Sequence, residues 1–132
     1  MSKPKIIIID DEQELLDLLK MSMEMEGYEV ITAIDGEEGL KVIEEHKPDL
    51  IICDIVMPKL DGYDVLKAVR EKSGRWIPFI MLSAVSDFNK IKKAHEESVD
   101  FYLTKPVQEW ILTKNIRALL NISKQRKEDS AQ

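Results

Sequence analysis

Three runs of apolar residues in this chain are almost uninterrupted: KIIIID at 5–10, DLIICD at 49–54 and IPFIMLS at 77–83. A strand with one face in water would alternate apolar and polar side chains, whereas a strand covered on both faces shows no such alternation. The runs therefore predict strands of a parallel sheet that is buried on both sides. Such a sheet requires helices packed against each of its faces.

Two further runs of strand length begin near Tyr28 and Asp100, so strands are expected at intervals of roughly 20 to 28 residues, separated by amphipathic segments. In the first of these segments the apolar residues at helical spacing are Leu15, Leu18, Leu19 and Met23. The alternation predicts a doubly wound α/β domain with a five-stranded parallel sheet and helices on both faces. In such a domain ligands bind at the carboxyl ends of the strands.

Residues typical of helix ends mark the expected helices. In chain order they are the C-terminal cap Gly27, the N-caps Asp35 and Asp61, the helix openings Ser86 or Asp87, and the first-turn proline Pro106. The second helix is expected to end at His46 and the fifth near Ser123. The last residues are polar and show no pattern, so we expect a domain over 4–122 and a polar tail or truncated linker over 123–132.

Length, charge and cysteine content limit the functional classes. The 132 residues suffice for one domain, and the apolar runs are far too short to span a bilayer. The N-terminus lacks the apolar region of a signal peptide, so a cytoplasmic location is expected. The formal net charge of −6 disfavours direct binding to nucleic acid or to an anionic membrane. The single cysteine, Cys53, lies in an apolar run and is expected to be a buried thiol.

Polar residues stand where the predicted strands end, and in a parallel sheet these ends meet along one edge. They are Asp10 and Asp11, Asp54, Ser83, Thr104 and Lys105. Each acid taken alone is better explained as a helix cap or a surface turn. The gathering of all these groups at one edge favours a binding site instead.

Three carboxylates at one edge require a positive partner, because two carboxylates about 4 Å apart repel by roughly 4 kcal/mol at an effective dielectric near 20. Lys105 supplies one positive charge, and oxygen ligands of this kind are those that Mg2+ prefers. Zinc is disfavoured, since His46 and His95 are expected on helix surfaces and not at this edge. A magnesium ion, a lysine, a hydroxyl and a carboxylate can together hold a phosphoryl group, with Asp54 as the candidate nucleophile.

Four motifs at these positions resemble the receiver domain of two-component response regulators. They are DD at 10–11, DIVMPKLDG at 54–62, SA at 83–84 and YLTKP at 102–106. The resemblance covers residues 4 to 121, nearly the whole chain. It implies the flavodoxin-like strand order 2-1-3-4-5 and a signalling switch. Such a switch catalyses its own phosphorylation and dephosphorylation but turns over no separate substrate.

The resemblance also implies a role for each matching residue. Asp54 is the expected phosphoacceptor, and it takes the phosphoryl group from a sensor histidine kinase or a phosphotransfer protein. Mg2+ is the expected cofactor. Its expected ligands are Asp11 directly, Asp10 mostly through water, Asp54, and the backbone carbonyl of Val56.

Three further residues are expected to respond to the phosphoryl group. The Ser83 hydroxyl and Lys105 would contact its oxygens, and Tyr102 would turn inward as the hydroxyl moves. These movements would change the face made by the fourth helix, the fifth strand and the fifth helix, and so alter the binding of a downstream effector domain or protein, or produce a phosphorylation-dependent dimer. The resemblance further implies a cis Lys105–Pro106 peptide bond. The sequence fits a stand-alone regulator as well as a receiver cut from a longer protein.

Several positions depart from the family pattern. Ser98 and Val99 stand where many members have Gly-Ala, so a helix cap there would be strained. Val56 and Val85 occupy the positions at which the family tunes the access of water to the acyl phosphate. Both are apolar, and our hypothesis is a long-lived phosphorylated state. Trp110 is expected to be exposed, either as an anchor for an output partner or packed partly against a neighbouring helix.

Three other functions fit parts of the pattern. A hydrolase of the haloacid dehalogenase type also uses an aspartate and Mg2+, but it wants a second aspartate where this chain has Val56. A flavodoxin-like FMN carrier would need a loop rich in Ser, Thr and Gly after the first strand, where this chain has DDEQ. A phosphate-independent docking module remains, although every active-site position of the receiver family is filled.

Overall fold

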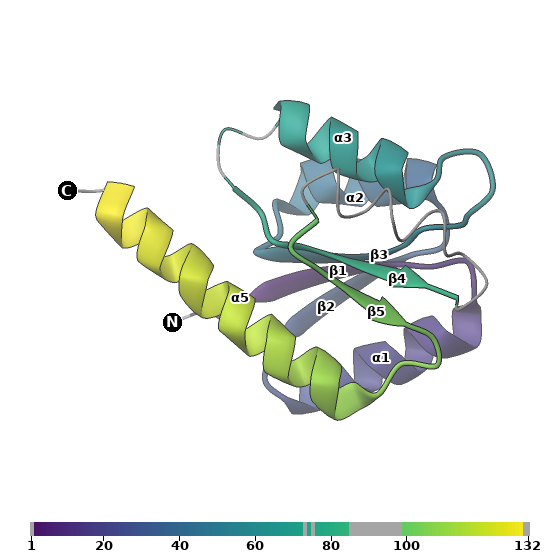
Figure 1. The fold of residues 1–132 in the computed structure, drawn as a ribbon, viewed down its shortest axis with the longest axis horizontal. Helices are drawn as coiled ribbons and strands as arrows, with labels where there is room; N and C mark the ends of the chain where they lie inside the picture. The colour runs from purple at the N-terminus through teal and green to yellow at the C-terminus, as the bar shows by residue number, and fades with distance from the viewer. Residues whose placement is uncertain (1, 73, 75, 85–98, 131–132) are drawn as a thin grey trace.

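A computed structural model describes residues 2–72, 74, 76–84 and 99–130 as a layered α/β domain (Figure 1). In chain order its elements are β1 (Lys5–Ile9), α1 (Gln13–Met25), β2 (Glu29–Ala33), α2 (Gly36–His46), β3 (Leu50–Asp54), α3 (Gly62–Lys72), β4 (Phe79–Ser83), β5 (Phe101–Thr104) and α5 (Glu109–Ser130). The five strands form one parallel sheet in the order β2-β1-β3-β4-β5, which confirms the predicted fold class and strand order.

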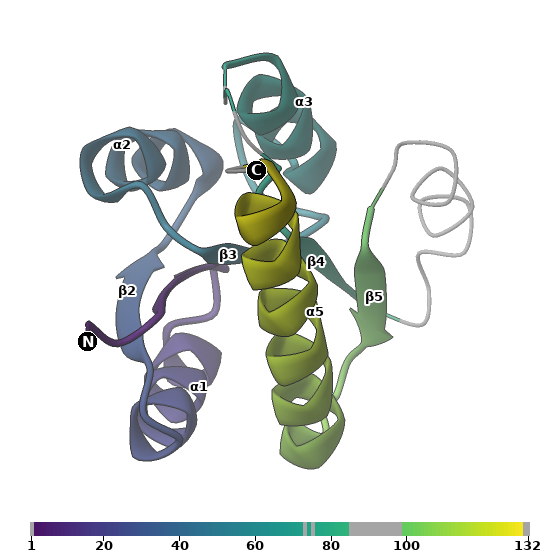
Figure 2. The same cartoon turned by 90° about the vertical axis from the view of Figure 1, so that its left-hand side faces the viewer.

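The sheet is covered on both faces, as the uninterrupted apolar runs predict. Helices α1 and α5 lie on one face, and α2 and α3 lie on the other (Figure 2). Successive side chains of β1 alternate between two cores: Ile6 and Ile8 pack on the side of α1 and α5, and Ile7 and Ile9 on the side of α2 and α3. All four are 0% exposed, and burying each contributes roughly 1.5–3 kcal/mol. The strand that leads to the acidic pair is therefore held from both sides.

Three of the predicted helix caps, Asp35, Asp61 and Gly27, are confirmed. The Asp35 side chain accepts a hydrogen bond of 2.8 Å from the Glu38 N–H at the start of α2. Asp61 accepts one of 3.0 Å from the Asp64 N–H, and the Asp64 side chain accepts one of 2.9 Å from the Asp61 N–H, which forms a reciprocal cap on α3. Gly27 follows α1 with a φ of +95°, a left-handed conformation that favours glycine.

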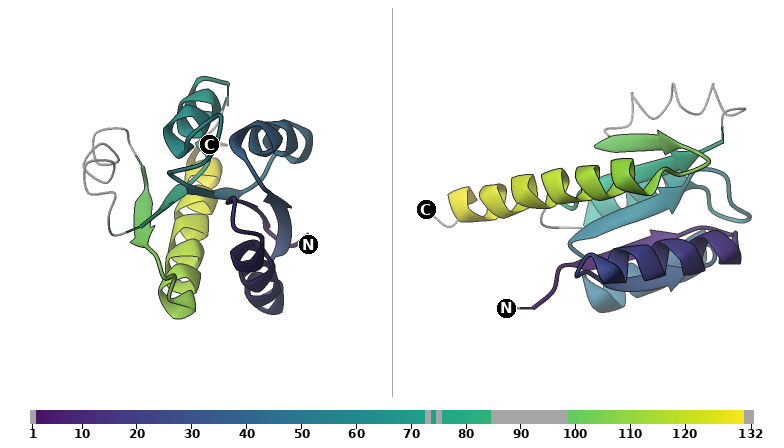
Figure 3. Two further views of the ribbon diagram at one scale, coloured as in Figure 1. Left: turned by 90° about the vertical axis from the view of Figure 1, so that its right-hand side faces the viewer. Right: turned by 90° about the horizontal axis from the view of Figure 1, so that it is seen from below.

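Two helices differ from expectation. In α1 Leu19 and Met23 are buried and Leu15 packs against the same core, as the helical spacing indicates, but Leu18 is 52% exposed and the core includes Leu16 instead. Helix α5 begins at Glu109, after Pro106 rather than at it, and continues past Ser123. Its distal part, up to Ser130, extends beyond the sheet, so most of the stretch expected to be an irregular tail is helical (Figure 3).

The remaining fold predictions concern single residues. Cys53 is buried and His46 is exposed, as predicted. The helix opening at Ser86 or Asp87, His95 and the turn residue Ser98 lie outside the described residues. Within the described ranges, every helix is too short or too polar to cross a membrane.

A polar cluster at the amino-terminal edge of the sheet joins several elements. Asp100, just before β5, accepts hydrogen bonds from Arg70 Nη2 at 2.9 Å and the Phe79 N–H at 2.8 Å through Oδ2, and from Trp76 Nε1 at 3.2 Å through Oδ1. The guanidinium of Arg126 stacks over the Trp76 ring, 3.9 Å from its centroid. The distal part of α5 is therefore tied to the segment between α3 and β4.

Candidate functional site

The strand register places the predicted polar residues at one edge. Ile9 of β1 pairs with Cys53 of β3, so Asp10 and Asp54 each come next along neighbouring strands. Asp54 pairs with Leu82, which precedes the last residue of β4, Ser83, and Ser83 pairs with Thr104 of β5. The sequence prediction that these strand ends converge is confirmed by the geometry.

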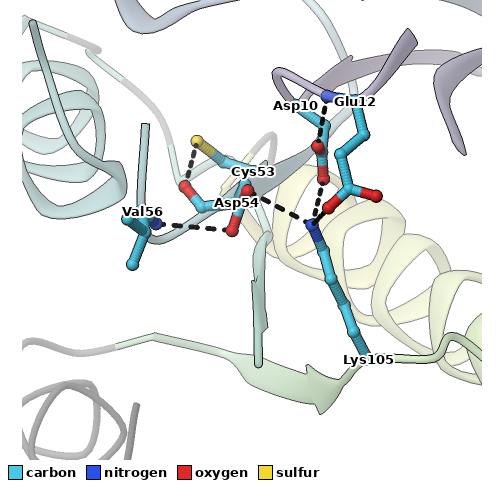
Figure 4. A network of polar contacts seen from close by, with 6 residues as sticks. All are labelled: Asp10, Glu12, Cys53, Asp54, Val56 and Lys105. Atoms are coloured by element: carbon cyan, nitrogen blue, oxygen red, sulfur yellow. Dashed lines mark hydrogen bonds and ion pairs between the residues drawn. The ribbon is translucent and has the colours of Figure 1, made fainter. Parts of the chain in front are cut away.

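Lys105 joins the carboxylates at this edge (Figure 4). Its Nζ lies 2.9 Å from Asp10 Oδ2, 2.9 Å from Glu12 Oε1 and 3.2 Å from Asp54 Oδ2. Burial lowers the pKa of Lys105, but hydrogen bonds and charges from Glu12, Asp10 and Asp54 outweigh it and raise the pKa overall. The ammonium group is therefore firmly protonated, and one cation is shared by three acids.

The two buried carboxylates of the cluster are in electrostatic conflict. Asp10 is 0% exposed, its Oδ1 accepts a 2.9 Å hydrogen bond from the Glu12 N–H, and burial raises its pKa. Burial and the charge of Asp10 raise the pKa of Asp54 to about 6, while Lys105 opposes the shift. At pH 7 Asp54 is therefore mainly ionised, yet its charged form is held at a cost that a bound cation would relieve.

The loop after β3 lies tightly against Asp54. The Val56 N–H points to Asp54 Oδ1 at 3.3 Å, a long hydrogen bond, and the Val56 side chain is 44% exposed. The Gly62 N–H donates to the Ile55 carbonyl at 2.8 Å. A Cβ at Gly62 would stand 2.6 Å from the Asp54 carbonyl oxygen, so only glycine permits this close approach.

Ser83 has an unusual environment. It is 0% exposed, and its Oγ has no hydrogen-bond partner among the described residues. A buried hydroxyl without a partner costs about 1–3 kcal/mol, so the position indicates a ligand that the hydroxyl would contact. Tyr102 lies on β5 in register with Met81 and is half-buried, packed against the core on the side of α2 and α3. The Lys105–Pro106 peptide bond is cis.

The group of acids that could hold a cation shares Asp10 and Asp11 with the predicted ligand set but contains Glu12 in place of Asp54. Oxygen atoms of Asp10, Asp11 and Glu12 lie within 4.8 Å of one another, and Asp11 and Glu12 are exposed. Carboxylate oxygens are the donors that Mg2+ prefers. The sequence analysis did not single out Glu12, whose only signal was its place directly after the acidic pair.

The family described as the response regulator receiver domain matches residues 6–117. The chain belongs to this family. Receiver domains of two-component systems are signalling proteins whose general function is a phosphorylation switch, and they do not turn over a separate substrate. The family generally uses Mg2+.

Relatives of the receiver domain include transcriptional regulators. The present chain is 42% identical over 120 residues to the alkaline phosphatase synthesis transcriptional regulatory protein PhoP of Bacillus subtilis. The aligned region covers 90% of this chain and 49% of PhoP. The chain is 35% identical over 128 residues to the transcriptional regulatory protein AfsQ1 of Streptomyces coelicolor, which covers 97% of this chain and 56% of that protein. The chain thus spans about half the length of these curated relatives.

Solved structures agree with the fold of the receiver domain. A CheY-like receiver domain protein from Methanospirillum hungatei superposes with a TM-score of 0.86 at 31% identity, covering 95% of this chain and 99% of that one. The chemotaxis protein CheY4 of Vibrio cholerae superposes with a TM-score of 0.82 at 28% identity, covering 89% and 99%.

Proposed function

We propose that this receiver domain is switched by phosphorylation of Asp54, with the phosphoryl group taken from the phosphohistidine of a sensor histidine kinase or a phosphotransfer protein. The single observation that carries the proposal is the setting of Asp54. Its carboxylate is nearly buried at the end of β3, Oδ2 lies 3.2 Å from Lys105 Nζ, and the long contact to the Val56 N–H is the only one that Oδ1 makes with the described residues.

The chemistry is a transfer between two nucleophiles. An Asp54 carboxylate oxygen attacks phosphorus, a P–O bond forms as the P–N bond breaks, and the bonding pair stays on the imidazole nitrogen, which takes up a proton. Lys105 lies where it can neutralise oxygens of the arriving group. The product is an acyl phosphate on Asp54, whose roughly two negative charges stand beside the Asp10 carboxylate and require Lys105 and a bound cation as partners.

The donor set fits Mg2+. We assign Asp10, Asp11, Asp54 and the backbone carbonyl of Val56 as the residues that would hold the ion, and we assign Glu12 to Lys105 because its Oε1 lies 2.9 Å from the ammonium. The bound ion would neutralise charge on the phosphoryl oxygens. The Asp10 side chain, which is buried beside a single lysine, gains a second cationic neighbour in this arrangement.

The switch is proposed to start at Ser83. The buried, unpartnered hydroxyl would donate a hydrogen bond to a phosphoryl oxygen, and Tyr102 would turn inward into the space that the movement leaves. Ser83 ends β4, and Tyr102 lies on the neighbouring strand β5. We therefore propose that phosphorylation changes the face made by the fourth helix, β5 and α5, although the fourth helix lies outside the described residues.

The output is proposed to be control of an effector. Because the relatives named above are transcriptional regulators of about twice this length, we propose that the receiver regulates an effector domain or protein, with a phosphorylation-dependent dimer as one route. It does not itself contact nucleic acid in this proposal, which agrees with the net charge of −6. The kinase and receiver would meet in the cytoplasm.

The lifetime of the phosphorylated state is proposed to be long. Val56 is 44% exposed beside Asp54, and an apolar branched side chain there cannot orient an attacking water. Replacing Val56 with Asn or Glu, alone and with the same change at Val85, should accelerate spontaneous dephosphorylation. Unchanged decay of the purified phosphoprotein in the double variant would contradict the proposal.

The function is tested by incubating the protein with Mg2+ and acetyl phosphate or phosphoramidate and measuring the intact mass. We expect the mass to increase by one phosphoryl group, and we expect hydroxylamine to remove it. Asp54→Ala should abolish the increase, as should omission of Mg2+, whereas Asp17→Ala on the exposed side of α1 should not. Persistence of the modification in Asp54→Ala would place the phosphoryl group elsewhere and overturn the proposal.

A further inference from the structure

An apolar groove of about 550 Å³ lies between α2 and α3, away from the carboxylates of the site. Its apolar lining comes from Leu40, Ile43, Ala68, Val69 and Ile77. Its charged lining is mainly positive, with Lys41, Lys47 and Lys72 against the single acid Glu44. In a chain of net charge −6, this local excess of cations favours an apolar occupant that carries carboxylates.

The outer side of α1 has the complementary character. Leu18, Met21 and Met25 are 52%, 62% and 83% exposed. Their spacing of i, i+3 and i+7 places them in one stripe, which is the spacing by which amphipathic helices insert into grooves. Asp17 and Glu24 are exposed on the same helix and, by helical geometry, lie next to each other along one edge of this stripe. The stripe and the groove are therefore both apolar, and the acids beside the stripe are opposite in charge to the lysines that line the groove.

The stripe and the groove cannot meet within one molecule. Helix α1 covers one face of the sheet, and α2 and α3 cover the other (Figure 2). We infer that the α1 stripe of one copy of this chain docks into the α2–α3 groove of a second copy. The contact is head-to-tail, so each dimer keeps one unused stripe and one unused groove, and longer chains form at high concentration.

The strength and the triggers of this association follow from its composition. Three inserted side chains and a charged rim make a small interface, below the roughly 1,200 Å² of a standard stable one, so the association is weak and reversible. Salt weakens it by screening the contacts between acids and lysines. Neither surface includes Asp54 or Lys105, so the association does not depend on phosphorylation and is distinct from the proposed phosphorylation-dependent dimer.

Two variants test the inference, one that disrupts the stripe and one that disrupts the groove. The stripe variant carries Leu18→Ser, Met21→Ser and Met25→Ser, and the groove variant carries Lys41→Glu and Lys72→Glu, all at exposed positions. Sedimentation velocity without a phosphodonor should show the wild type associating as its concentration rises. Each variant alone should associate at least roughly tenfold more weakly. An equimolar mixture should recover dimers but nothing larger, because it contains one intact stripe and one intact groove per pair.

The control variant Lys114→Glu with Lys124→Glu makes the same charge change on α5 and should associate as the wild type does. Thermal unfolding of every variant should match the wild type, since only exposed side chains change. Three outcomes overturn the inference: a wild type that stays monomeric, a stripe variant that associates normally, and a mixture that stays monomeric while the wild type associates. The last would indicate a two-fold contact of α1 with α1 or contact with another surface.

Discussion

The two ends of β5 carry charged clusters built in opposite ways. At the amino-terminal end, the carboxylate of Asp100 accepts hydrogen bonds from Arg70, Trp76 and the Phe79 N–H. The acid has a cation and two neutral donors, so its charge is compensated within the fold. Such a cluster holds α3, β4 and β5 in one arrangement.

At the carboxyl-terminal end, one ammonium group, that of Lys105, serves the three acids Asp10, Glu12 and Asp54. Burial and the neighbouring acid raise the pKa of Asp54 to about 6. The negative charge is therefore compensated in the cluster at the amino-terminal end of β5, whereas the cluster at its carboxyl-terminal end has an excess of negative charge. The difference indicates that the first cluster stabilises the fold, while the second stores a repulsion that a bound cation would relieve.

The largest contrast is expected in phosphorylation. Lys105→Met removes the ammonium group that lies 3.2 Å from the Asp54 carboxylate while keeping an apolar stem, so the initial rate with acetyl phosphate and Mg2+ should fall by roughly 10²-fold or more. Asp100→Asn changes the other end of the same strand and should leave the rate within about twofold, provided that the variant is folded. Equal losses in the two variants would mean that the Lys105 effect is a general consequence of disturbing β5.

The second contrast concerns stability. Asp100→Ala leaves the guanidinium of Arg70 and the N–H groups of Trp76 and Phe79 without this acceptor, and we expect the free energy of unfolding to drop by about 2–4 kcal/mol. Urea denaturation followed by circular dichroism measures the change, with Asp17→Ala as an exposed control. A loss no greater than that of the control would show that the cluster contributes little to the fold.

The third contrast has the opposite sign. Because the pKa of Asp54 is raised in the folded state, the folded protein holds more protons than the unfolded chain between about pH 4 and 6, and its stability falls as the pH rises through that interval. The side chain of the Asp54→Asn variant does not ionise, so this loss of stability with rising pH should be absent from the variant. Without Mg2+, it should match the wild type near pH 4 and exceed it by about 1–2 kcal/mol at pH 7. A variant less stable than the wild type at pH 7 would contradict the stored repulsion.

Most of the fold could be predicted because each strand can be recognised from its own short stretch of sequence. Ile6 to Ile9 are apolar at every position, and only a strand buried on both faces explains that run. The site followed from the fold, since parallel topology alone brings Asp10, Asp54 and Ser83 to one edge. Their roles in catalysis stay predictions, because the positions of the strand ends do not identify the group that binds there.

The features that could not be predicted from the sequence depend mainly on contacts between residues that are distant in the chain. Glu12 joins the site because the loop after β1 brings its carboxylate to Lys105, and no local pattern encodes a contact across 93 positions. Leu18 was misplaced because several leucines in α1 define a broad apolar face, and only packing decides which part of it is buried. The end of α5 was missed because the residues after Ser123 have no apolar periodicity.

The smallest contrast tests what holds that distal helix. Arg126 stacks on Trp76 at 3.9 Å, and such an exposed contact is worth about 0.5–1 kcal/mol. Arg126→Ala should lower the free energy of unfolding by that amount and increase amide hydrogen exchange over 124–130, while Lys124→Ala on the same exposed stretch should do neither. Because the ring that Arg126 covers also donates to Asp100, loss of the stack should loosen the compensated cluster slightly and leave the Asp54 pH dependence unchanged. An altered pH dependence in Arg126→Ala would show that the two ends of β5 are energetically coupled, and the separation between a stabilising and a reactive end would not hold.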